Sequence, residues 1–118
     1  MNAVKLIYVT TDFYATHCYP DAPEEVAFLR NVHRHKFFVT CKIQVFHNDR
    51  DLEFIMVKDR LYNFITCDLL KRSEISVSCE SICEHIFTWA KEIYGNDRKV
   101  FVRVSEDGEN GSEITDLY

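Results

Sequence analysis

The chain has 118 residues, of which 47% are hydrophobic and 28% are charged, and its formal net charge is −5 at pH 7. This composition excludes a disordered chain, and the length fits a single domain over residues 1–118. No run of Lys and Arg is long enough to follow a phosphate backbone, so nucleic acid is not an expected partner. No apolar run is long enough to span a bilayer, and the first residues do not resemble a signal peptide, so we expect a cytoplasmic protein without a membrane partner.

Residues 4–18 predict a first strand with one buried face, because their hydrophobic residues alternate. The segment 19–23 predicts a loop, since its two prolines cannot join a ladder, and Glu24 to Arg30 predicts a short helical turn. The second strand, from His33 to His47, has the clearest pattern. Its odd positions form an apolar face that begins and ends in histidine: His33, His35, Phe37, Val39, Cys41, Ile43, Val45 and His47.

The middle of the chain predicts two helices. Residues 52–65 are ambiguous, and we interpret them as a brief extended entry followed by a helix from about Lys58. Ser78 is a typical N-cap for a helix from Cys79 to Tyr94, which Gly95 ends.

The last part of the chain predicts two more strands. Val100, Val102 and Val104 indicate a third strand, with Glu106 next on the same face. Residues 107–111 predict a turn, and Ser112 to Tyr118 a fourth strand. The expected fold is therefore α+β, with a four-stranded antiparallel sheet and two helices on one face in the order ββααββ.

Three histidines form a candidate metal site. Residues two apart in a strand share a face, so His33 and His35 can direct their rings at one point. His17 ends the first strand, and pairing of the first two strands would place it beside them. Three imidazoles and one open position are the usual plan of a catalytic zinc site. The alternative is that each histidine is a surface residue or a hydrogen-bonded one, since a His-x-His pair alone is weak evidence.

The five cysteines, at positions 18, 41, 67, 79 and 83, include no Cys-x-x-Cys pair. We expect buried free thiols in a reducing compartment. Cys18 follows His17 directly, and strand alternation places it on the opposite face. A charged cluster of Asp49, Arg50 and Glu53 is interpreted as a solvated corner rather than a contribution to a site.

Four motifs, in order along nearly the whole chain, resemble the 6-pyruvoyltetrahydropterin and 6-carboxytetrahydropterin synthase family. Phe13-Tyr14-Ala15-Thr16-His17 resembles its Phe-x-Ala-Ala-His, and Val32-His33-Arg34-His35-Lys36-Phe37 its Leu-His-Gly-His-x-Tyr. The segment 78–83 is similar to its Pro-Thr-x-Glu-Asn-Leu-Ala, and 102–106 to its late strand ending in Glu-Thr.

The resemblance implies a T-fold, whose ββααββ subunits assemble into barrels as homo-oligomers such as trimers or hexamers. It implies zinc at His17, His33 and His35, and a pterin or purine-like ring bound by Glu106. A carboxylate suits that role because it accepts two parallel N–H bonds. From the residues alone, Glu106 would be interpreted as a solvated carboxylate.

The sequence departs from the family at its proton-transfer residues. Leu29 stands where the family has its catalytic cysteine, and Arg34 stands where it has Gly between the two histidines. The family's Asp-Phe falls on Val57-Lys58, and only Asp68 remains near its Asp-His-x-x-Leu-Asn segment. Asp68 and Glu80 are weak candidates for the missing general base, and the catalytic residues stay unassigned.

The resulting hypothesis is a zinc-dependent lyase acting on a dihydropterin triphosphate or a related heterocycle, as in the routes to biopterin or to queuosine. The alternative is a catalytically altered or inactive T-fold module that binds a purine-like or pterin-like small molecule. A third interpretation, altered zinc chemistry on a related heterocycle, is not separable from the first by sequence.

Overall fold

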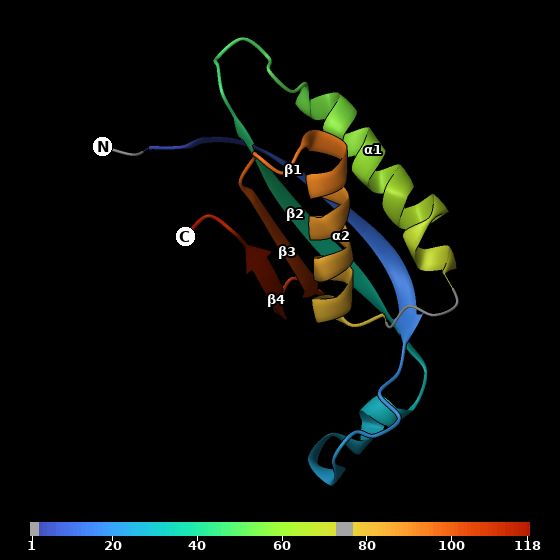
Figure 1. Cartoon of the computed structure of the whole chain (residues 1–118). Coiled ribbons are helices and arrows are strands. Elements are labelled where there is room, and N and C mark those ends of the chain that lie inside the picture. Colours follow the sequence, from blue (N-terminus) through green and yellow to red (C-terminus); the bar gives the residue numbers. More distant parts are fainter. Residues whose placement is uncertain (1–2, 73–76) are drawn as a thin grey trace.

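The computed structural model describes residues 3–72 and 77–118, without the side chain of His17. Four strands, β1 (Lys5–His17), β2 (His33–Val45), β3 (Val100–Glu106) and β4 (Asn110–Thr115), form one antiparallel sheet in the order β1-β2-β3-β4. The helices α1 (Phe54–Cys67) and α2 (Cys79–Tyr94) lie on the same face of this sheet (Figure 1). The expected α+β fold and its ββααββ order are confirmed.

The predicted limits of α2 are confirmed by its capping groups. The Ser78 side chain accepts a hydrogen bond from the backbone N–H of Ser81 at 3.1 Å, and Gly95 follows the helix with a φ of 110°. The predicted start of α1 near Lys58 is wrong, because the helix begins at Phe54. The Glu53 carboxylate caps it by accepting from the N–H of Met56 at 2.9 Å. Glu53 is therefore more than part of a solvated corner.

The last two strands form a tighter hairpin than the sequence suggested. The strand β4 begins at Asn110 and ends at Thr115, so the predicted range 112–118 is shifted toward the C-terminus. Asp107 and Gly108 have φ angles of 57° and 75°, and the N–H of Glu109 bonds to the carbonyl of Glu106 at 3.0 Å. Positive φ at both central residues is the signature of a type I′ turn, for which Asp-Gly is a favoured pair.

The core lies between the sheet and its two helices. Its side chains come from one face of the strands, from the inner stripes of both helices and from the short segment after α1. The largest of those that are almost fully enclosed are Phe37, Ile43, Leu61, Ile65, Leu69, Ile82, Ile86, Val39, Val100, Val102, Val104 and Cys41. The rings of Phe13 and Phe37 stack with centroids 5.2 Å apart. Burial of this apolar surface supplies the main stabilisation of the fold.

At one end of the sheet an ion pair joins the β2–α1 loop to the chain entering β3. The guanidinium of Arg98 donates to Asp51 at 3.0 Å and to the carbonyl of Gln44 at 2.9 Å. The Asp51 carboxylate also accepts from the N–H of Phe46 at 2.8 Å. Hydrogen bonds from Arg98, followed by the one from Phe46, hold the pKa of Asp51 below its ordinary value.

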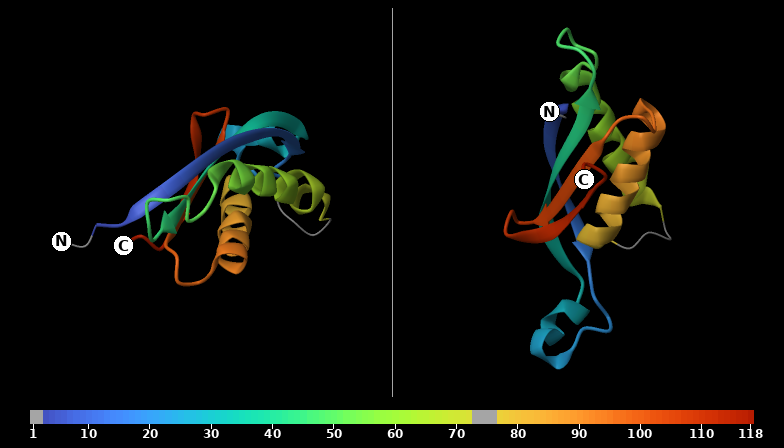
Figure 2. Two further views of the ribbon diagram at one scale, coloured as in Figure 1. Left: turned by 90° about the horizontal axis from the view of Figure 1, so that it is seen from above. Right: turned by 60° about the vertical axis from the view of Figure 1, so that its left-hand side comes forward.

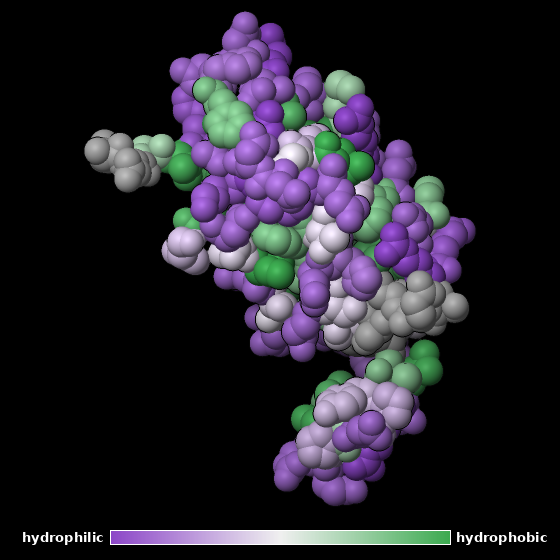
Figure 3. Space-filling model, viewed as in Figure 1, coloured by the Kyte–Doolittle hydropathy of each residue, from purple (hydrophilic) through white to green (hydrophobic). Residues whose placement is uncertain are grey.

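At the other end, residues 18–32, here called the arm, project from the body of the molecule (Figures 1 and 2). The arm contains the short 3-10 helix η1 (Glu24–Arg30), as expected, and the N–H of Tyr19 bonds to the carbonyl of Leu29 across its base at 2.6 Å. Hydrophobic atoms lie on its surface (Figure 3), where Phe28 and Val32 are 70% and 71% exposed. The arm therefore exposes apolar side chains beside charged ones.

All five cysteines are free. Cys41, Cys79 and Cys83 are buried as expected, whereas Cys18 and Cys67 are exposed. In the parts of the chain that the structure describes, no helix combines the length and the hydropathy needed to cross a membrane.

Candidate metal centre

The two histidines of β2 lie at the point where the apolar face of the strand ends. Phe37 is fully buried, while the side chains of His35 and His33, two and four residues before it on the same face, lie beyond the enclosed core. Their rings are 4.7 Å apart between centroids, and their planes are perpendicular. The structure thus brings two of the three predicted ligands together.

The backbone places the third position beside them. The strands β1 and β2 pair without interruption from Lys5 opposite Val45 to His17 opposite His33. Directly opposed residues of an antiparallel pair lie on the same sheet face, so position 17 falls on the face of positions 33 and 35. The side chain of His17 lies outside the described residues. Among the side chains that are described, no three His, Cys, Asp or Glu groups form a metal-binding cluster.

The rings of His33 and His35 are both hydrogen-bonded through Nδ1. The His33 Nδ1 lies 2.7 Å from the carbonyl oxygen of Asn31, and the His35 Nδ1 lies 2.6 Å from Oδ2 of Asp107. Since a carbonyl or carboxylate oxygen only accepts, each Nδ1 carries the proton, and in the neutral ring the lone pair is on Nε2. Metal-binding histidines are commonly held in this way through the nitrogen that does not face the metal. These rings therefore fit a zinc site bound through Nε2.

Two carboxylates flank His35. The strand β3 sets Glu106 opposite Phe37, and Oε2 of Glu106 lies 3.9 Å from Nε2 of His35. Asp107 is on the other side, at Nδ1, and this hydrogen bond holds the pKa of Asp107 below its ordinary value. Glu106 thus lies beside His35, and its side chain is only 30% exposed.

A pocket of about 570 Å³ opens beside the histidine pair, between the base of the arm and the start of α2. Its walls combine the predicted site residues with arm and helix residues: Cys18, Tyr19, Leu29, His33, Val77, Ser78, Cys79, Glu80, Glu106, Asn110 and Gly111. A cavity of several hundred Å³ suits a small heterocyclic ligand. The sequence prediction for Cys18 is wrong, because β1 ends at His17 and the chain then leaves the strand alternation.

The remaining candidates fall into two groups. Leu29 and Glu80 line this pocket, so the position that the resemblance aligns with a catalytic cysteine borders the pocket but carries an alkyl group. Asp68 instead ends α1 and forms an ion pair with Arg72 at 3.0 Å. The guanidinium carbon of Arg34 lies 4.4 Å from the ring centroid of Tyr14. Tyr14 belongs to the sheet face opposite the histidines.

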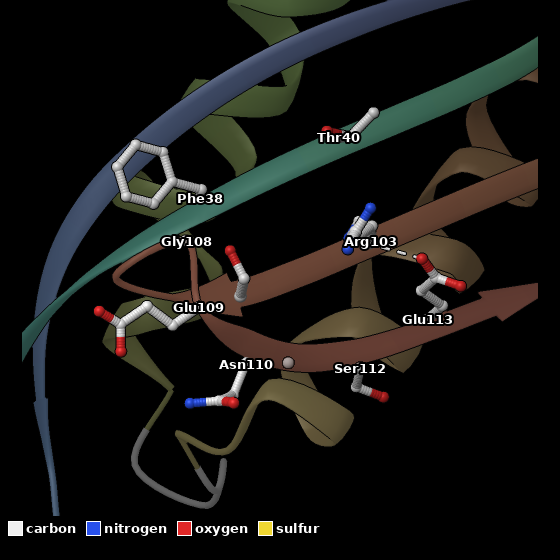
Figure 4. A pocket seen from close by; sticks show the side chains of 10 residues that line it. Phe38, Thr40, Arg103, Gly108, Glu109, Asn110, Ser112 and Glu113 are labelled. Atoms are coloured by element: carbon white, nitrogen blue, oxygen red, sulfur yellow. Dashed lines mark ion pairs between the residues drawn. The ribbon is translucent and has the colours of Figure 1, made fainter.

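A second hollow, of about 530 Å³, lies on that opposite face (Figure 4). Phe38 and Thr40 of β2 border it, together with Arg103 of β3 and Glu113 of β4, which form an ion pair at 3.4 Å. No histidine or cysteine is among the described side chains that line it. His33 and His35 lie instead on the face of the sheet that carries the core.

Sequence reasoning missed two residues of the site, Cys18 and Asp107. The signal for Asp107 was the Asp-Gly pair after the third strand, which fixes a tight turn and so returns residue 107 to β2.

No protein-family model matches the chain, and no curated protein matches it.

Proposed function

We propose that this chain is a zinc-dependent lyase acting on a dihydropterin triphosphate or a related purine-like heterocycle. One observation carries the proposal: the β1–β2 register gathers positions 17, 33 and 35 at one end of one sheet face. The Nδ1 hydrogen bonds of His33 and His35 add support, since histidines that bind a metal through one ring nitrogen are commonly oriented by a hydrogen bond at the other. Zinc held there would polarise an oxygen of the substrate.

Glu106 is the proposed anchor for the heterocyclic ring. It lines the pocket that His33 also lines, and a carboxylate accepts two parallel N–H bonds from an amidine edge. The pocket volume of about 570 Å³ suits a small heterocyclic ring. No general base is assigned, although Cys18 and Glu80 reach the same pocket.

The alternative function is a T-fold module that binds such a ring without converting it. Leu29 favours this alternative, because an alkyl side chain in the pocket wall cannot transfer a proton. Altered zinc chemistry on a related heterocycle is the third candidate. Mass analysis separates the binding module from the two catalytic candidates. A converted substrate mass supports a catalytic function, and ligand recovered unchanged supports a binding module.

Homo-oligomer formation is part of the proposal. The radius of gyration is 15.6 Å, whereas a compact chain of this length has about 13.5 Å. The arm exposes Phe28 and Val32, and both β1 and β4 are edge strands of the sheet in the single chain. Light scattering of the pure protein tests this, and a monomeric mass would contradict it.

Metal analysis of the purified protein tests the zinc centre. We expect about one zinc per chain in the wild type and a loss of most of it in His33→Ala. His47→Ala is the matched control, since His47 is an exposed histidine that follows the far end of β2. Equal metal content in all three proteins, or none in the wild type, would contradict the metal centre.

The reaction is tested separately with zinc-loaded protein and dihydroneopterin triphosphate. We expect a product mass from the wild type and none from His33→Ala. Unchanged substrate with the zinc-loaded wild type would exclude this substrate for the lyase.

A further inference from the structure

The turn that follows β3 is fastened to β2 beside the histidines. The N–H of Asp107 donates to the carbonyl of Lys36 at 2.7 Å, which extends the β2–β3 ladder past its last paired residues. The turn keeps Asp107 and Gly108 at positive φ, so the chain reverses at once and residue 107 stays close to β2. The position of residue 107 is thus set by the backbone.

Both carboxylate oxygens of Asp107 are used at this position. Oδ2 accepts from Nδ1 of His35 at 2.6 Å, and Oδ1 accepts from the N–H of Lys36 at 3.3 Å. Two acceptor atoms on one planar group fix the orientation of the carboxylate, and the carboxylate in turn fixes the plane of the imidazole ring. The bond also determines which ring nitrogen carries the proton.

We propose that Asp107 is a positioning residue that holds His35 as the Nδ1–H tautomer and thereby sets the affinity of the site for Zn²⁺. This inference rests on the zinc centre of the proposed function. His33 is held differently, because its Nδ1 donates to the backbone carbonyl of Asn31, which no substitution removes. Asp107 is therefore a side chain through which the affinity of the histidine pair can be changed without replacing a ligand.

The variant Asp107→Asn tests the proposal with little disturbance of the turn. Asn is favoured at the same turn position, so the hairpin is expected to form. Its amide has one acceptor oxygen, so it cannot accept from both His35 and Lys36 as the carboxylate does. We expect the affinity for Zn²⁺, measured by competition with a chromophoric chelator, to fall about 10-fold to 100-fold.

Asp12→Asn is the matched control. Asp12 is a half-exposed carboxylate on β1 that faces Lys36 across the strand pair at 4.0 Å. The change removes the same charge from the same sheet, and we expect a Zn²⁺ affinity within about twofold of the wild type. Thermal unfolding of both variants shows whether they are folded. A zinc affinity of Asp107→Asn equal to that of the control would overturn the proposal.

The tautomer of His35 provides a readout that does not require metal. In ¹⁵N-histidine-labelled apoprotein, with His35→Ala to assign the signal, we expect a protonated Nδ1 in the wild type and a changed tautomer ratio in Asp107→Asn. If the wild type binds no zinc, the proposed metal centre fails while this spectrum still decides the role of Asp107. An unchanged His35 signal would refute that role.

Discussion

The two halves of β2 have the same alternation but different surroundings. From Phe37 to Ile43 the inward side chains are apolar and almost fully enclosed, whereas those of His35 and His33 are only partly buried. The inward face of one strand thus serves as core at one end and as the wall of a pocket at the other. The difference shows that burial, rather than strand alternation, separates the stabilising part of this face from the part that borders the pocket.

The largest effect expected from this contrast is on stability. Phe37→Ala removes a fully buried ring that stacks on Phe13 at 5.2 Å. We expect the free energy of unfolding to fall by about 3–5 kcal/mol, measured by urea denaturation. Phe37→Leu is the control and should cost less, because most of the buried volume is kept. A loss below about 1 kcal/mol for Phe37→Ala would mean that the core does not extend to this position.

Thiol reactivity compares the enclosed core with the exposed parts of the chain in a second way. Burial raises the pKa of Cys41 and of Cys79 to about 12, and that of Cys83 to about 11. At neutral pH a rise of three units lowers the thiolate fraction about a thousandfold. We expect a maleimide to label Cys18 and Cys67 rapidly in the native protein and the buried three only after unfolding, as followed by mass spectrometry. Rapid native labelling of Cys41 would contradict the structure.

The Asp51–Arg98 ion pair predicts a dependence of stability on pH. The pKa of Asp51 is lower in the folded chain than its ordinary value of 3.8, chiefly because Arg98 donates to the carboxylate. The stabilisation of the fold by the ionised Asp51 carboxylate is therefore complete above about pH 4. It is lost as the pH falls through the pKa that Asp51 has in the folded chain. Asp51→Asn should lower the melting temperature at pH 7 and have less effect near pH 2. An equal loss of melting temperature at pH 7 and near pH 2 would show that ionisation of Asp51 does not stabilise the fold.

The smallest expected effect is that of His33→Ala on the stability of the metal-free protein. His33 lies outside the enclosed core, so its removal should change the free energy of unfolding by less than about 1 kcal/mol. Urea denaturation beside Phe37→Ala compares the two ends of the strand directly. A loss as large as that of Phe37→Ala would show that the histidine end is part of the core.

Much of the fold could be predicted because local signals agree with the tertiary structure. Ser78 and Gly95 mark both ends of α2, and the alternation from Phe37 to Val45 gives the buried face of β2. The start of α1 was missed because Phe54, Ile55 and Met56 are all more than half exposed. A continuous apolar run resembles a buried strand, whereas here these side chains lie on the surface of a first helical turn.

Some features of the site could also be predicted from the sequence, and others could not. The meeting of positions 17, 33 and 35 follows from simple pairing of two adjacent strands, and the register bears out that pairing. The contribution of Asp107 could not be predicted from alternation. It depends on the turn at residues 107 and 108, which the Asp-Gly pair indicated, and on the pairing of β3 with β2, which alternation does not define. Cys18 was misplaced because alternation was applied one residue past the end of β1.

The ladder between β1 and β2 runs for thirteen residue pairs without a bulge, and the three histidine positions lie at its last rungs. A slip of one residue would turn every side chain of the displaced strand to the other face and separate position 17 from its neighbours. A cation bound there would therefore favour the native alignment over every shifted one, by an amount that grows with its concentration. Metal binding would therefore make a shifted pairing of β1 and β2 less populated than it is in the metal-free chain.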